Sequence, residues 1–322
     1  MQEFNDDNKG AKDMNAQDLE QSVWNLGTEQ NNADTENIDQ MSPLEIVEAF
    51  IHEDKKIIPA IALDKEDIAL GIETIAESFR AGGRLIYFGA GTSGRLGILD
   101  ASEAPPTFGT DPEMVQGRIA GGPKAITQAI EAAEDSEATG AKEVLDLNVD
   151  EKDTIVGITA SGRTPYVIGA VKEANKLGAS TIGVASNQDA ELSNFVDIAI
   201  TPVSGPELIQ GSTRLKAGTA TKMVLNILST GAMIRIGKVY GNRMVDMKPT
   251  NDKLKVRSVR QTMDITGEDK ETVLPYLKAC DYHVKTAVLC ILGEVDVKTA
   301  QALLKKNKGF LRNAIAEAQA RK

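Results

Sequence analysis

Two glycine-rich turns that carry hydroxyl side chains are the clearest candidates for chemistry in this sequence. Residues 89–94 read GAGTSG and residues 159–165 read TASGRTP, and each turn stands between an apolar run and a helical pattern. Backbone N–H groups at a helix N-terminus bind anions, and neighbouring hydroxyls add further donors. The turns therefore predict a site for a phosphate group. The candidate phosphate-binding residues are Gly91, Thr92, Ser93, Thr159, Ser161 and Thr164.

Three other interpretations of these turns have to be weighed. The first turn matches the dinucleotide fingerprint, but residues 117–122 (GRIAGG), which end the second predicted strand, contain no acidic residue to bind a ribose. The Walker form needs a lysine followed by Ser or Thr after the glycines, and this sequence lacks it. The hydroxyls could also act only as helix caps, with Thr164 as N-cap before Pro165. Two such turns at the carboxyl ends of neighbouring parallel strands favour phosphate binding.

The first candidate for acid–base chemistry is Glu103, which closes a helix predicted over 94–103. Leu96, Leu99 and Glu103 stand at helical spacing, so we expect Glu103 on a core-facing stripe, and the prolines at 105–106 to end the helix. A glutamate on an apolar stripe loses hydration, which favours its neutral form and suits acid–base catalysis near neutral pH. The alternative is a solvated surface residue, because most of the 47 acidic residues must lie in water.

Glu134 has the same pattern on a second helix, predicted over 124–136. Ile126, Ile130 and Glu134 lie four residues apart, which again predicts a glutamate on an apolar stripe. A third carboxylate, Glu207, follows the last predicted strand, shortly before the sequence GSTRLK at 211–216. Spacing alone favours a loop or capping role for Glu207.

Short apolar runs alternating with helical patterns indicate βαβ units, and therefore an α/β fold with a doubly wound parallel sheet. The predicted strands are 85–88, 114–119, 154–159, 181–185 and 198–201, and the helices between and after them are 94–103, 124–136, 165–177 and 214–236. A capping box at Ser42 to Glu45 and a stop at Gly82-Gly83 mark helices before the sheet. We expect a flexible polar extension over 1–27, the sheet domain with its N-terminal helices over 28–248, and a small all-helical C-terminal unit over 249–322.

Composition argues against nucleic-acid-binding, membrane-spanning and metal-dependent proteins. A net charge of −11 and an aromatic content of 4% argue against nucleic-acid binding. No apolar stretch is long enough to span a bilayer and no signal segment is visible, so we expect a cytoplasmic protein. Cys280 and Cys290 are interpreted as core residues, and His52 and His283 as structural or surface residues. Two histidines are too few for the usual zinc or iron sites, so no metal and no other cofactor is expected.

Four segments closely resemble the signature sequences of N-acetylmuramic acid 6-phosphate etherases. They are YFGAGTSGRLGILDASEAPPTFG at 87–109, AAEDS at 132–136, ASGRTPY at 160–166 and GSTRLKAGT at 211–219. The resemblance runs from about Thr28-Glu29 to the C-terminus. Two positions depart from the family pattern: Ala104 stands where Cys is frequent, and Asn31 where Arg is common.

The resemblance implies a sheet of the sugar isomerase (SIS) type, a homodimer and a helical C-terminal unit. It implies cleavage of the lactyl ether of N-acetylmuramic acid 6-phosphate by water, giving N-acetylglucosamine 6-phosphate and D-lactate in cell-wall recycling. By motif, Glu103 corresponds to the catalytic acid, Glu134 to the second catalytic carboxylate, and Glu207 to a substrate-site glutamate of wider SIS relatives.

Three alternative functions remain open at this point. An aldose–ketose isomerase of the same fold would use a similar base without an ether substrate. A sugar-phosphate-sensing regulator, like the glucokinase regulatory protein, would share the turns but should lack an acid at the position of Glu103. A nicotinamide dehydrogenase is disfavoured by the missing ribose-binding acid.

Overall fold

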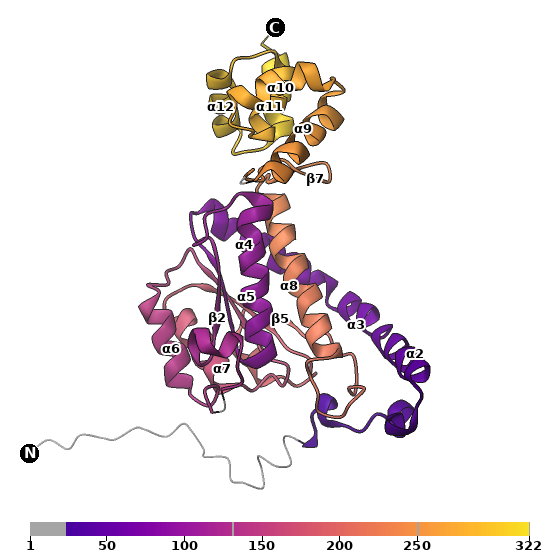
Figure 1. Cartoon of the computed structure of the whole chain (residues 1–322). Coiled ribbons are helices and arrows are strands. Elements are labelled where there is room, and N and C mark those ends of the chain that lie inside the picture. Colours follow the sequence, from indigo (N-terminus) through magenta and orange to yellow (C-terminus); the bar gives the residue numbers. More distant parts are fainter. Residues whose placement is uncertain (1–23, 131, 250, 322) are drawn as a thin grey trace, which may run out of the picture.

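The core of the protein is a five-stranded parallel sheet. The computed structural model describes residues 24–130, 132–249 and 251–321, so most of the predicted extension lies outside the described residues (Figure 1). The strands are β1 (Leu85–Gly89), β2 (Val115–Ile119), β3 (Thr154–Ile158), β4 (Ser180–Val184) and β5 (Ile198–Ile200), in the order β2-β1-β3-β4-β5. Each strand ends within one residue of its predicted limits, and the predicted α/β fold with a parallel sheet is confirmed.

Helices cover both faces of the sheet. Successive side chains of a strand point to opposite faces. Leu85 and Tyr87 therefore pack in one cluster with helices α4 (Lys65–Arg80), α5 (Gly91–Phe108) and α8 (Lys216–Arg235). Ile86 and Phe88 pack in the other cluster with α7 (Pro165–Lys176), against which α6 (Glu137–Asp146) lies. On this face α8 packs against both α4 and α5, and Figure 1 shows α8 beside α5.

The strand order places a topological switch point between β1 and β3. These strands are neighbours, with Gly89 opposite Ile158, but the chain runs from β1 outward to β2 and from β3 outward to β4. The loops that follow β1 and β3 therefore diverge, and they leave a crevice at the carboxyl edge of the sheet, where ligands of open α/β sheets bind. Both glycine- and hydroxyl-rich turns lie at this edge.

The prediction of a helix over 124–136 is wrong. A short 3-10 helix, η4 (Gly122–Ile126), is followed by irregular backbone at 127–130 and 132–136, and the regular helix α6 starts only at Glu137. Ala132 has a positive φ of 59°, which a right-handed helix cannot include. In addition, Arg95 donates hydrogen bonds to the carbonyls of Ile126 (2.9 Å) and Gln128 (3.0 Å). The apolar spacing before Glu134 thus does not form a buried stripe.

The predicted end and buried face of α5 also need correction. The helix includes both prolines at 105–106 and ends at Gly109, whose positive φ of 63° and N–H bond to the Pro105 carbonyl close it. Its buried face is made largely of small residues such as Gly97 and Ala101, which bring the helix close to the sheet. Leu99 is 48% exposed, and Glu103 is also exposed, so Glu103 does not lie on a core-facing stripe.

Short helices precede the sheet and run along the outside of α8 (Figure 1). They are the 3-10 helices η1 (Gly27–Glu29), η2 (Ala33–Thr35) and η3 (Ile38–Gln40), followed by α2 (Pro43–Asp54) and α3 (Ile57–Leu63). The predicted capping box is confirmed, because Ser42 and Glu45 bond each other's backbone N–H groups at the start of α2.

Five helices follow the sheet domain and pack around a hydrophobic cluster of their own. A hairpin of β6 (Val239–Tyr240) and β7 (Arg243–Met244), which the sequence pattern did not predict, leads into them. The helices are α9 (Asp252–Thr266), α10 (Lys270–Ala279), α11 (Val284–Gly293), α12 (Val297–Lys306) and α13 (Leu311–Gln319). Cys280 and Cys290 are both buried in this cluster, as predicted. Within the described residues, no helix is both long and apolar enough to cross a membrane.

Candidate active site

A cavity of about 240 Å³ lies at the carboxyl ends of β1 and β3. All six predicted phosphate-binding residues line it, and so does Glu134. The remaining lining comes from Thr28 and Glu29 of η1 and from residues around the start of α8, among them Thr213 and Gly218. The structure thus brings both turns and one of the two predicted catalytic glutamates into a single cavity, at the switch point of the sheet.

The first turn opens the long helix α5 directly into this cavity. Gly89 ends β1, Ala90 is the N-cap residue, and the helix starts at Gly91 with a positive φ of 52°. A Cβ atom on Gly89 would come within 2.6 Å of the Gly94 nitrogen, so the tight turn requires glycine there. No side chain caps the helix, so its first N–H groups and the hydroxyls of Thr92 and Ser93 remain available to a ligand.

The second turn groups three hydroxyls after β3. Thr159 Oγ1 lies 2.7 Å from Thr164 Oγ1 and 3.2 Å from Ser161 Oγ, and Ser161 accepts a hydrogen bond from the Arg163 N–H. Thr164 occupies the N-cap position of α7, as predicted, but its hydroxyl bonds Thr159 instead of a helix N–H. Helix capping therefore does not explain these hydroxyls in either turn.

Uncharged hydrogen-bond donors, namely hydroxyl and backbone N–H groups, dominate the cavity lining near the two turns. The lining within the described residues contains no lysine or arginine, whereas it includes the carboxylates of Glu29 and Glu134. A bound phosphate would have to be held by hydroxyls and by the N-terminus of α5, whose aligned peptide dipoles favour an anion. Two carboxylates would repel the phosphate, so they suit the other end of a ligand.

Glu134 reaches the cavity from a turn and not from a helix. Its carbonyl accepts a hydrogen bond of 2.9 Å from the Tyr166 N–H, which ties the turn to the start of α7. Its side chain is exposed, and lines both the main cavity and a smaller one beside Arg95. The carboxylate is thus accessible to a ligand, and the backbone that carries it is held by this hydrogen bond.

Glu103 lies elsewhere in the same chain. It stands about three helical turns beyond Gly91, which is roughly 18 Å along the axis of α5. There it lines a different cavity of about 390 Å³, between α5, α8 and the β6–β7 hairpin. A single chain therefore does not bring Glu103 to Glu134.

Glu207 does not line either cavity. Its side chain is completely buried and accepts hydrogen bonds of 2.9 Å from the backbone N–H groups of Lys216 and Ala217. Burial raises the pKa of this carboxyl, although the two N–H groups act in the opposite direction. Glu207 thus caps α8 and fixes the helix that forms one wall of the main cavity, which is the role favoured by its spacing. The substrate-site role implied by the resemblance does not fit this chain, because the buried carboxylate does not reach the cavity.

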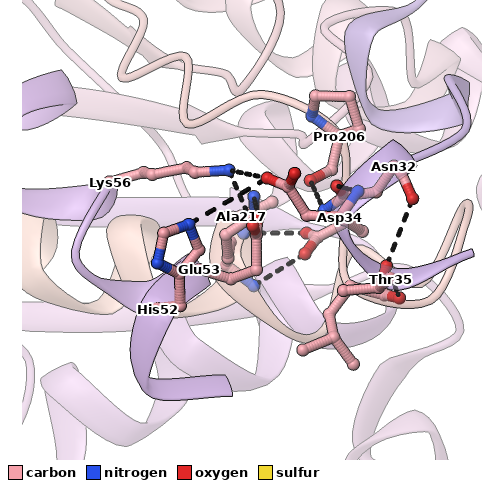
Figure 2. A network of polar contacts seen from close by, with 11 residues as sticks. Asn32, Asp34, Thr35, His52, Glu53, Lys56, Pro206 and Ala217 are labelled. Carbon is pink, nitrogen blue, oxygen red and sulfur yellow. Dashed lines mark hydrogen bonds and ion pairs between the residues drawn. The ribbon is translucent and has the colours of Figure 1, made fainter. Parts of the chain in front are cut away.

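A buried ion pair fastens α2 to the start of α8. The ammonium group of Lys216 bonds Glu53 Oε2, and each side chain is 1% exposed. On the outer side, Lys56 Nζ lies 2.6 Å from Glu53 Oε1 and 3.3 Å from Asp34 Oδ2 (Figure 2). His52 also approaches Asp34, so Asp34, His52 and Glu53 lie close together. Because the Lys56 ammonium lies between the two carboxylates and Lys216 bonds Glu53, lysines neutralise the charge of this cluster.

Thr28 and Glu29 are site residues that spacing did not single out. The only sequence signal that could have indicated them is that the resemblance to the etherases begins at these two residues. Their segment shows no periodicity that would predict a contact with the sheet, and Glu29 lies more than 180 positions before its contacts Gln210 and Gly211.

Two protein-family models match overlapping parts of the chain. The model of the glucokinase regulatory protein N-terminal SIS domain matches residues 67–175, and the SIS domain model matches residues 131–230. Among solved structures, a protein from Bacteroides fragilis described as a phosphosugar isomerase involved in capsule formation has a TM-score of 0.48. It is 18% identical and covers 60% of this chain and 91% of its own.

Two relatives are similar along nearly their whole length. An N-acetylmuramic acid 6-phosphate etherase of Klebsiella aerogenes is 52% identical over 291 residues, which is 90% of this chain and 97% of the relative. One from Vibrio campbellii is 49% identical over 298 residues, covering 92% of this chain and 97% of the relative. At this level of identity and coverage, the chain belongs to the N-acetylmuramic acid 6-phosphate etherase family.

Proposed function

We propose that this protein cleaves the D-lactyl ether of N-acetylmuramic acid 6-phosphate with water, giving N-acetylglucosamine 6-phosphate and D-lactate. The observation that carries the proposal is the cavity at the switch point, where two hydroxyl-rich turns adjoin Glu134. Membership of the etherase family supports the same substrate. We place the reaction in the cytoplasm, as the sequence predicts.

The 6-phosphate binds to the two turns in this proposal. Ser93 and Ser161 donate from their hydroxyls, and the first N–H groups of α5 complete the anion site. The sugar then extends toward Glu134. This orientation keeps the negative phosphate away from the carboxylates, which act on the carbon chain of the sugar.

The reaction is an elimination followed by an addition. In the open-chain sugar the C2–H bond is acidic, because it is α to the C1 aldehyde. Glu134 accepts the C2 proton as general base, the C3–O bond breaks, and Glu103 donates a proton to the departing lactate oxygen. Water then adds to C3 of the unsaturated aldehyde and a proton returns to C2, so the net change is hydrolysis of the ether.

A second copy of the chain supplies Glu103 in this mechanism. The separation along α5 keeps Glu103 of one chain out of the cavity that contains Glu134. In a two-fold dimer each subunit can complete the site of the other. The exposure of Glu103 and Leu99 on the surface of α5 is what a partner-facing segment requires.

The test of the function is incubation with N-acetylmuramic acid 6-phosphate and measurement of D-lactate. We expect one lactate for each N-acetylglucosamine 6-phosphate formed, and poor turnover of unphosphorylated N-acetylmuramic acid. Equal turnover with and without the phosphate would refute the role of the two turns. Interconversion of aldose and ketose phosphates without lactate release would favour the isomerase alternative.

A further inference from the structure

The segment 27–35, which we call the strap, lies outside the sheet and borders the cavity with Thr28 and Glu29. Its first anchor is Thr28, which is 2% exposed. The Thr28 N–H donates to Asn187 Oδ1 at 3.3 Å, and Asn187 Nδ2 donates both to Thr28 Oγ1 and to the Ala160 carbonyl in the second turn. The Thr28 carbonyl accepts from the Gly211 N–H at 3.1 Å. The strap is therefore bonded to both sides of the cavity.

Three further contacts hold the strap against the loop before α8. The Glu29 carbonyl accepts from Gln210 Nε2 at 2.7 Å, and the buried Thr35 hydroxyl donates to the Leu208 carbonyl at 2.9 Å. Asn32 Nδ2 donates to the Pro206 carbonyl at 3.5 Å, and Figure 2 shows Asn32 and Thr35 pointing to this loop. Asn32 and Thr35 are buried, so their hydrogen bonds satisfy polar side chains that have left water and hold the strap against this loop.

The side chain of Glu29 is the part of the strap that lines the cavity. Its carboxylate is partly buried, and in the described part of the chain no hydrogen bond or ion pair reaches it. It lies against Gly211, where an added Cβ atom would come within 2.9 Å of Glu29 Oε2. Glycine thus leaves room for a carboxylate that has a fixed backbone and free acceptor sites.

We propose that Glu29 is a specificity-determining residue that accepts a hydrogen bond from a hydroxyl or amide N–H of the bound sugar. This inference deepens the proposed function, because it assumes that the ligand is a sugar phosphate. A carboxylate accepts from neutral donors but repels phosphate, and the hydroxyl-rich turns already provide the anion site. Glu29 therefore selects for the sugar portion and not for the phosphate.

The experiment measures two dissociation constants by calorimetry, one for N-acetylglucosamine 6-phosphate and one for inorganic phosphate. The variants are Glu29→Ala, Glu29→Gln and the control Glu36→Ala, an exposed glutamate of the same N-terminal region that lines no described cavity. We expect Glu29→Ala to bind the sugar phosphate about tenfold or more weakly, since hydrogen bonds to charged groups contribute that much. Inorganic phosphate should bind as tightly as to the wild type or more tightly, because a negative charge is removed. The glutamine variant should fall between, because its amide oxygen still accepts a hydrogen bond.

Three results would overturn the inference. Sugar-phosphate affinity of Glu29→Ala equal to that of Glu36→Ala would show that no donor contacts the carboxylate. Parallel weakening of both ligands would show that Glu29 only supports the structure, and parallel tightening that it only repels anions. Failure of the proposed function is recognised separately: the wild type would release no D-lactate, whereas the two dissociation constants would still report on Glu29.

Discussion

The placement of Glu103 on α5 leads to a prediction about which subunit supplies the acid. Glu103 lies roughly 18 Å along the helix from the cavity that holds Glu134, and lines another cavity of its own chain. If the acid acts across a two-fold interface, each active site combines Glu134 of one subunit with Glu103 of its partner. The perturbation is a pair of single variants, Glu103→Gln and Glu134→Gln, each of which should release almost no lactate alone.

Mixing the two variants should restore activity by an amount that follows from counting sites. Random exchange of subunits makes about half of the dimers hybrids, and in each hybrid one site contains both substitutions while the other contains none. The mixture should therefore show about a quarter of the wild-type rate of D-lactate release. If both glutamates acted within one chain, no hybrid site would be intact and the rate would stay at the level of the single variants.

The assay needs proof that subunits exchange. Two affinity tags, one on each variant, allow hybrids to be purified and assayed directly, and a purified hybrid should reach about half of the wild-type rate per dimer. The matched control is a mixture of Glu103→Gln with the double variant, which contains no intact site in either arrangement. Purified hybrids as inactive as this control would refute the shared site, and full activity of either single variant would refute the two-carboxylate mechanism.

Three further predictions concern the turns, the two glutamates and the buried ion pair. Ser161→Ala should weaken sugar-phosphate binding by about 1.5–3 kcal/mol, measured by calorimetry, because a hydrogen bond to a charged group is lost. In deuterated water, Glu103→Gln should still exchange the C2 proton of N-acetylglucosamine 6-phosphate, whereas Glu134→Gln should not, because only the base acts at C2. Lys216→Met should lower the free energy of unfolding by about 3 kcal/mol, since it leaves Glu53 buried with one partner fewer. Burial acts to raise the pKa of Glu53, but hydrogen bonds from its lysine partners outweigh it and hold this pKa below its ordinary value. The stability that this group contributes is therefore present above pH ~4.3 and is lost as the pH falls further, a dependence that Glu53→Gln should remove.

The predictions for the turns and for the ion pair have control variants, and the exchange prediction has an outcome that would reverse it. Ser193→Ala, at a half-buried position of a 3-10 helix outside the cavity lining, should leave sugar-phosphate affinity unchanged. An exchange pattern opposite to the expected one would reverse the roles of the two glutamates. Lys142→Met removes an exposed i,i+4 pair and should cost less than about 0.5 kcal/mol in urea unfolding. A loss for Lys216→Met no larger than this would contradict the reasoning about burial.

The sequence by itself determined the features that depend on local pattern. Apolar runs of strand length and helical periodicity predicted the five strands, and α7 and α8 within two residues at each end. Glycine and hydroxyl residues after β1 and β3 predicted the two turns, because parallel strands place such turns at one edge of a sheet. The positions of Gly91 and Ser161 in the cavity lining could therefore be predicted from the sequence.

Only the tertiary structure decided how segments distant in the sequence meet. Glu134 matched a helical spacing, but the positive φ of Ala132 and the bonds from Arg95 turn its segment into irregular backbone. Glu103 matched an apolar stripe, but close packing of small residues turned another face of α5 to the core. Glu29 reaches the cavity through hydrogen bonds to residues more than 150 positions away, and no periodicity encodes such contacts. Local conformational preferences can be read along a chain, whereas the pairing of distant surfaces depends on packing that the sequence specifies only as a whole.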